Sequence, residues 1–113
     1  LGKEEYADFK NIHSMGIDVA LATDYNPGTC MIQSLPFIMS LGIMKCGFNL
    51  DQAFKAVTYS AAKSIGKENQ IGTIERNYTA DLLFWSIESY EEIPYWVSEN
   101  KIIGVMKIPL EQN

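Results

Sequence analysis

The stretch VALATDYNPGT, residues 19–29, runs apolar for four residues and then breaks at Asp24 into a turn sequence. Such short runs of small and branched apolar residues are typical of a strand that is covered on both faces, as in a parallel sheet. In parallel α/β folds the loops at the carboxyl ends of the strands meet on one face, where ligands bind. Asp24 is therefore placed for a ligand or a general base. An Asx-turn or a helix N-cap is the ordinary alternative, because Asp and Asn before Pro-Gly are common turn formers.

The residues before this stretch predict a helix that leads into the strand. Residues 4–15 carry apolar side chains at helical spacing, and the pattern stops at Gly16, where a helix end favours glycine. We expect a helix over 4–15 and a strand over 18–22. A helix followed directly by a buried strand is half of a repeating α/β unit, so the sequence predicts the α/β class.

Two further helices are predicted downstream. Residues 31–45 are apolar nearly all round, which predicts a buried helix that ends at Gly47. Asn49 and Gln52 have the spacing of a capping box, in which each side chain accepts a hydrogen bond from the backbone N–H of the other residue. The helix that this box opens is expected to end at Gly66. Its apolar face is predicted to carry Ala53, Val57, Ala61 and Ile65.

The residue pattern changes from helical to strand-like in the second half of the chain. The stretches IGTIERNYTADLLFW (71–85) and KIIGVMKI (101–108) have the composition of short strands separated by turns, with no further helical period of any length. We therefore expect two parts, one over residues 1–66 and the other over residues 67–113.

The amino-acid composition indicates which binding partners are unsuited to this chain and in which cellular compartment it is expected. The 113 residues are 47% hydrophobic with a formal net charge of −5, which suits a small globular domain and offers no basic surface to nucleic acid or an anionic membrane. No apolar run approaches the ~20 residues that span a bilayer. Cys30 and Cys46 lack both CxxC spacing and the density of a disulfide scaffold, which favours the reducing cytoplasm. The chain opens on Leu1 rather than Met, so we expect further sequence upstream.

A series of motifs, in order, resembles the imidazolonepropionase family of the metal-dependent amidohydrolase superfamily. The motifs are VALATDYNPGT, SLPFIMSLG, AFKAVTYSAAKSIG, IGTIERNYTADLLFW and YEEIPY. The third and fourth are similar to patterns found throughout the superfamily, whereas TDYNPGT and YEEIPY resemble the imidazolonepropionases in particular. The resemblance covers about residues 16–105.

The resemblance implies both a fold and a reaction. Residues 1–66 would be the last strand and following helices of a (β/α)₈ barrel, and residues 67–113 the C-terminal part of a small β-sandwich. The family holds one divalent metal, zinc or iron, with three histidines and one aspartate. Its reaction is the hydrolysis of the cyclic amide of 4-imidazolone-5-propanoate to N-formimidoyl-L-glutamate, a step in histidine degradation.

The resemblance also assigns roles to individual residues. Asp24 matches the aspartate that closes the eighth barrel strand, which makes it a metal ligand and the catalytic carboxylate that handles protons for the attacking water. Asn26, Gly28 and Thr29 match positions that hold substrate, and a Gly-Thr pair in a turn can present backbone N–H groups and a hydroxyl to a carboxylate. Plain turn chemistry is the alternative for these residues.

The chain departs from the family pattern in its histidines. His13 is the only one, and it falls in the predicted helix before the strand, so we interpret it as a surface or packing residue. A catalytic zinc site needs about three protein ligands, and Asp24 by itself is expected neither to hold the metal nor to catalyse. We expect the missing N-terminal part of the enzyme to supply the other ligands, a small molecule as substrate, and a homodimer for the full-length enzyme.

Two other functions stay open at this point. The chain could belong to another amidohydrolase, a deaminase or cyclic amidase that acts on a different ring, although TDYNPGT and YEEIPY favour the first assignment. It could also be a folded interaction module without catalysis or a metal.

Overall fold

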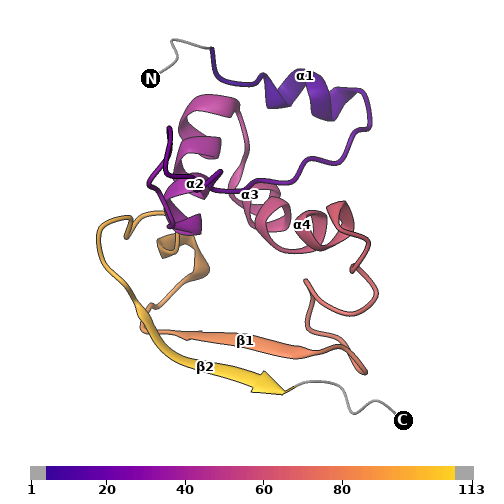
Figure 1. Cartoon of the computed structure of the whole chain (residues 1–113), viewed down its shortest axis with the longest axis vertical. Helices are drawn as coiled ribbons and strands as arrows, with labels where there is room; N and C mark the ends of the chain where they lie inside the picture. Colours follow the sequence, from indigo (N-terminus) through magenta and orange to yellow (C-terminus); the bar gives the residue numbers. More distant parts are fainter. Residues whose placement is uncertain (1–4, 109–113) are drawn as a thin grey trace.

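Helices in the first part of the chain and a two-stranded sheet in the second make up the computed structural model, which describes residues 5–108 (Figure 1). The elements in chain order are α1 Phe9–Ser14, α2 Leu35–Leu41, the π-helical turn η1 Gly42–Cys46, α3 Leu50–Val57, α4 Tyr59–Ser64, β1 Ala80–Trp85, the 3₁₀ turn η2 Tyr90–Glu92 and β2 Ile102–Ile108. Within residues 5–108, no helix is long and apolar enough to cross a bilayer.

The predicted helix over residues 4–15 is present in a shorter form, as α1. The Asp8 side chain accepts a hydrogen bond from the Asn11 backbone N–H at 3.2 Å, which places the start of the helix at Phe9. Gly16 follows the end of α1 with a φ of 75°, as predicted for a glycine beyond a helix. Residues 5–8 are not helical, because the Asp8 cap begins the helix after them.

The predicted strand over residues 18–22 is not present as a strand among residues 5–108. Side chains alternate between exposed at 18, 20 and 22 and half-buried at 19 and 21, so one face is covered rather than both. The Leu21 backbone N–H donates to the Ala56 carbonyl in α3 at 3.1 Å, and no strand ladder forms. A strand of a parallel sheet is defined by hydrogen bonds to its neighbours, and residues 5–108 supply no parallel neighbour here.

A helix is present from Leu35 onward where the sequence predicts one over residues 31–45, but it is not buried all round, because Leu35 is 41% and Met44 is 64% exposed. The Ser34 side chain accepts a hydrogen bond from the Phe37 backbone N–H at 3.3 Å and begins α2. The helix continues as η1, and Gly47 ends it in the left-handed conformation with a φ of 84°. Met39 of α2 is 2% exposed.

The capping box of Asn49 and Gln52 is confirmed. The Gln52 backbone N–H donates to Asn49 Oδ1 at 2.8 Å, and the Asn49 backbone N–H donates to Gln52 Oε1 at 2.9 Å. The single long helix to Gly66 is wrong, because the chain breaks at Thr58, with φ −120° and ψ −91°. The Thr58 hydroxyl donates to the Phe54 carbonyl four residues back at 2.8 Å, a local bond that competes with the helix.

The break also changes the predicted apolar face. Ala53 is buried as predicted, but Ile65 is 67% exposed. In α4 the buried alanine is Ala62 rather than the predicted Ala61, which is half-buried. A face that is extrapolated along one continuous helix is lost because the helix is interrupted at Thr58 and begins again at Tyr59.

The stretches predicted as short strands supply one antiparallel pair, β1 and β2, whereas residues 71–79 form bends and turns rather than a strand. Ala80 lies opposite Ile108 and Leu82 opposite Met106, and the register shifts between Phe84 and Trp85. The sheet lies below the helices in Figure 1. Side chains on both strands remain in contact with solvent, among them Leu83, Phe84, Ile103, Val105 and Ile108.

The main core forms where α1, α2, α3 and the segment after β1 meet. Its buried members are Phe9, Met39, Phe48, Ala53, Ala56 and Ile93. Val19 and Leu21 pack against this core from the segment that precedes Asp24, while Trp85 and Ile87 reach it from the end of β1. The core therefore anchors the segment that leads to Asp24 and the end of β1 to the same helices.

Candidate functional site

A tight turn after the 18–22 segment brings the four predicted site residues together. The Asn26 backbone N–H donates to the Cys30 carbonyl at 2.8 Å, and the two residues form an isolated antiparallel bridge. Asp24 lies just before the bridge, and Gly28 and Thr29 lie inside it. The turn is built from local hydrogen bonds, which is the chemistry expected of Asn-Pro-Gly.

Asp24 has an unusual backbone and an open side chain. Its φ of 51° is in the left-handed region, which costs a residue with a Cβ about 1 kcal/mol. The residue is exposed, and its carboxylate makes no hydrogen bond or ion pair with residues 5–108. A strained backbone that carries an unpaired carboxylate is typical of functional sites. The carboxylate is thus available to a ligand.

The Asn26 side chain forms hydrogen bonds with three other residues of the turn, Asp24, Gly28 and Thr29. Its Nδ2 group donates to the Asp24 carbonyl at 2.7 Å and reaches the Thr29 hydroxyl at 3.3 Å. Its Oδ1 atom accepts from the Gly28 N–H at 2.9 Å and from the Thr29 N–H at 2.8 Å. The plain turn chemistry that is the alternative for Asn26 is therefore present, whereas the Asp24 side chain makes no Asx-turn or cap hydrogen bond among residues 5–108. The expectation that the Gly28 and Thr29 N–H groups are presented to a carboxylate is wrong in this structure, because Asn26 Oδ1 already accepts both.

The side chains of Cys30 and Thr23, to which the sequence assigned no role, also shape the turn. The Cys30 thiol donates to the Thr23 carbonyl at 3.1 Å, and the Tyr25 backbone N–H donates to the Thr23 hydroxyl at 3.3 Å. The sequence indicates only that Thr23 and Cys30 lie at the two ends of the loop. A hydrogen bond between a side chain and a backbone group seven residues away matches no regular spacing, so it could not be predicted.

The residues present do not form a metal site on their own. Across residues 5–108 no group of three or more His, Cys, Asp or Glu side chains could hold a metal ion. His13 lies on α1, where its ring stacks on Phe9 with centroids 5.3 Å apart, as expected of a packing residue. Asp24 is the one carboxylate in the candidate turn.

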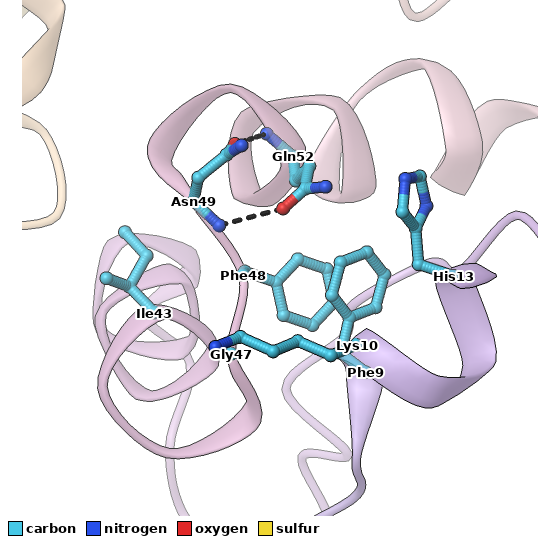
Figure 2. Close-up of a pocket in the computed structure, with 8 residues that line it drawn as sticks. All are labelled: Phe9, Lys10, His13, Ile43, Gly47, Phe48, Asn49 and Gln52. Carbon is cyan, nitrogen blue, oxygen red and sulfur yellow. Dashed lines mark hydrogen bonds between the residues drawn. The ribbon is translucent and has the colours of Figure 1, made fainter.

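A separate pocket of about 480 Å³ opens between α1 and the start of α3 (Figure 2). Figure 2 shows the rings of Phe9 and Phe48 lying one over the other at its centre, with centroids 3.5 Å apart. Lys10 and Gln52 supply polar edges. None of the four predicted site residues lines this pocket, so it is distinct from the Asp24 turn.

Residues 2–107 match the model of the amidohydrolase family. The chain belongs to the amidohydrolase family. This family comprises metal-dependent enzymes built on (β/α)₈ barrels, which places the helices of this amidohydrolase chain in the α/β architecture that the sequence predicts.

Curated relatives carry a more specific name. The imidazolonepropionase of Kosmotoga olearia is 38% identical over 105 residues, which are 93% of this chain and 26% of that protein. The imidazolonepropionases of Bacillus velezensis and Symbiobacterium thermophilum are each 36% identical, over 107 and 102 residues. These matches cover 95% and 90% of this amidohydrolase chain, and 25% and 24% of the two relatives. The chain thus spans about a quarter of the length of the curated relatives it matches.

Proposed function

We propose that this chain is the C-terminal portion of an imidazolonepropionase. The whole protein would hydrolyse the cyclic amide of 4-imidazolone-5-propanoate to N-formimidoyl-L-glutamate in histidine degradation. The observation that carries this proposal is the 36% to 38% identity to imidazolonepropionases over at least nine-tenths of the chain. The turn sequence TDYNPGT, with its open carboxylate, lies inside the matched region.

Residues 1–66 are proposed as the last strand and following helices of the barrel. The alternation of exposed and half-buried side chains over 18–22 supports this assignment, because it is the pattern of an extended segment with one face on a helix layer. Parallel neighbours from the rest of the protein would complete the ladder.

Residues 67–113 are proposed as the C-terminal part of a β-sandwich. A two-stranded sheet is at best marginally stable alone, and β1 and β2 leave large apolar side chains in solvent. Ile103 is 73% exposed and Val105 is 62% exposed. A second sheet from the rest of the protein would bury them.

Asp24 is proposed as the one metal ligand that this chain contributes, and as the carboxylate that takes a proton from the attacking water and returns it to the leaving nitrogen. Its exposure and its freedom from partners among residues 5–108 support this role. A divalent zinc or iron ion would supply Lewis acidity, and histidines elsewhere in the protein would complete its ligands. Asn26, Gly28 and Thr29 are proposed as the substrate loop, in which the Thr29 hydroxyl is the group least engaged by short hydrogen bonds.

The proposed partners are a small-molecule substrate, the N-terminal part of the enzyme and a second copy in a homodimer. Two free cysteines, Cys30 and Cys46, support a cytoplasmic location. Light scattering on the purified whole protein tests the dimer.

The test of the function uses the whole protein that contains this chain. Metal content and formation of N-formimidoyl-L-glutamate are measured for the wild type, for Asp24→Asn and for Asp81→Asn. Asp81 is an exposed carboxylate on β1 outside the turn, so its variant is a control for the same change of charge. We expect Asp24→Asn to lose activity by at least about 100-fold and Asp81→Asn to match the wild type.

One result would overturn the proposed function, and another would overturn only the role of Asp24. A wild type that binds no metal and leaves 4-imidazolone-5-propanoate intact would rule out the imidazolonepropionase assignment. A wild type that is active while Asp24→Asn retains full activity would keep the assignment and remove Asp24 from the site. A screen of other cyclic amides and amino-substituted rings then distinguishes another amidohydrolase from a protein without activity.

A further inference from the structure

The two peptide groups on either side of the Asp24 Cα atom are both held by side chains of the same turn. The Thr23 carbonyl, in the preceding peptide, accepts a hydrogen bond from Cys30 Sγ at 3.1 Å. The Asp24 carbonyl, in the following peptide, accepts from Asn26 Nδ2 at 2.7 Å. The N–H of that second peptide, which belongs to Tyr25, donates to Thr23 Oγ1 at 3.3 Å.

These contacts act on the two backbone angles of Asp24. The orientation of the preceding peptide sets φ and that of the following peptide sets ψ, so bonds to both groups determine where the Cβ atom points. Asp24 has a φ of 51°, in the left-handed region that Asp and Asn adopt more readily than other residues with a Cβ atom. The hydrogen bonds from Cys30 and Asn26 hold the peptides on both sides of Asp24 in this conformation.

We propose that Asn26 and Cys30 are positioning residues, which hold the Asp24 carboxylate in its working direction by fixing the backbone on each side of it. The inference rests on the proposed function for its catalytic consequence, but the fixing of the loop is a property of the turn itself. It gives Asn26 a role within the proposed substrate loop that does not require direct contact with substrate. Both ends of the Asn26 carboxamide are already engaged, with Nδ2 on the Asp24 carbonyl and Oδ1 on the Gly28 and Thr29 N–H groups.

Cys30 gives the cleanest test, because serine keeps a donor at the same position and alanine removes it. In the whole protein we expect Cys30→Ala to lower kcat about tenfold or more, the size of effect seen when a residue that orients a ligand is removed. The KM for 4-imidazolone-5-propanoate should change less than about twofold, because no group that binds substrate has been lost. Cys30→Ser should restore kcat to within about twofold of the wild type, since its hydroxyl can donate to the Thr23 carbonyl.

Asn26→Asp tests the second hydrogen bond. The new carboxylate can still accept from the Gly28 and Thr29 N–H groups, but it cannot donate to the Asp24 carbonyl. We expect the same signature, a loss in kcat of about tenfold with KM nearly unchanged. A rise in KM with kcat preserved would show instead that Asn26 contacts the substrate, and would overturn its positioning role.

Hydrogen exchange of the peptide over residues 23–30 gives a readout that does not depend on activity. We expect Cys30→Ala and Asn26→Asp to exchange faster than the wild type in this peptide, and Cys30→Ser to exchange at the wild-type rate. If the wild type is active but the variants keep both kcat and the slow exchange, the positioning role is overturned and the proposed function stands. If the wild type is inert, the proposed function fails, and the exchange rates alone decide whether Asn26 and Cys30 hold the turn.

Discussion

Asp18 and Lys63, 45 residues apart in the sequence, form an ion pair in which Lys63 Nζ lies 2.6 Å from Asp18 Oδ2. Lys55 approaches the other oxygen of the same carboxylate at 3.0 Å. The two contacts join the segment that leads to Asp24 with α3 and α4. Hydrogen bonds from Lys63 and then Lys55 lower the pKa of Asp18 from 3.8 to about 2, and the same contact raises the pKa of Lys63.

This ion pair predicts a dependence of stability on acid. Because the pKa of Asp18 is lower in the folded chain, its stabilising contribution is complete above pH 3.8 and is lost as the pH falls to about 2. Asp18→Asn should therefore lower the free energy of unfolding near neutral pH, and the difference from the wild type should vanish at the acid end. Urea unfolding of the whole protein over this pH range measures it. The pairs are partly exposed, so added salt should reduce the difference. A difference that is the same at every pH would contradict this assignment.

The capping box predicts a measurable loss from one side chain. Asn49→Ala removes the acceptor for the Gln52 N–H at the start of α3 and should lower the free energy of unfolding by about 1 kcal/mol. Asn69→Ala is the control, because Asn69 is exposed in a turn and makes no side-chain hydrogen bond within the described chain. Denaturant unfolding compares the two variants. Equal losses would mean that the box does not stabilise α3.

Replacing Gly72 or Gly16 with alanine allows the cost of backbone strain to be distinguished from the cost of steric contact. Both have a positive φ, 94° and 75°, so alanine is strained at each. A Cβ atom at Gly72 would lie 2.8 Å from Ala62 Cβ and 3.0 Å from the Thr58 carbonyl oxygen, whereas nothing lies within 4 Å at Gly16. We expect Gly72→Ala to cost about 1–3 kcal/mol more than Gly16→Ala, because the added methyl group must displace backbone. Thermal unfolding of both variants tests this, and equal shifts would rule out the close packing of Gly72 on α4.

Glu92 is predicted to matter more than its neighbour Glu91. Glu92 accepts hydrogen bonds from Trp96 Nε1 at 3.0 Å and from the Glu88 and Ser89 N–H groups at 2.9 and 3.2 Å. These bonds, led by that from Trp96, lower the pKa of Glu92 from 4.5.

The Glu92 contacts are tested by Glu92→Ala, with Glu91→Ala as the matched control. Glu92→Ala should lower the unfolding temperature and change Trp96 fluorescence, because three donors lose their acceptor. The Glu91 side chain accepts no hydrogen bond within residues 5–108, so its removal should do neither. The contribution of Glu92 should be present above pH 4.5 and should decline as acid protonates the carboxylate. Identical melting curves for the two variants would contradict the role of Glu92.

The sequence by itself determined the features that depend on neighbours along the chain. The Asn49 and Gln52 capping box, the end of η1 at Gly47 and the end of α1 before Gly16 all appear as predicted, because a cap or a left-handed glycine is decided within about four residues. The strands β1 and β2 follow from the same short-range patterns. The Asp24 turn was also recognisable, since Asn-Pro-Gly has few other local conformations.

Only the tertiary structure decided which partners meet across long distances and which groups remain free. The pairing of Asp18 with Lys63 joins residues whose separation follows no local period. The break at Thr58 and the exposure of Ile65 depend on packing and on one side-chain hydrogen bond that competes with the helix. Residues 18–22 show the same limit, because an apolar segment becomes a strand only when other strands supply its hydrogen bonds. Within the Asp24 turn the hydrogen bonds of Asn26 are local, but only the three-dimensional structure shows that the Asp24 carboxylate has no partner among residues 5–108.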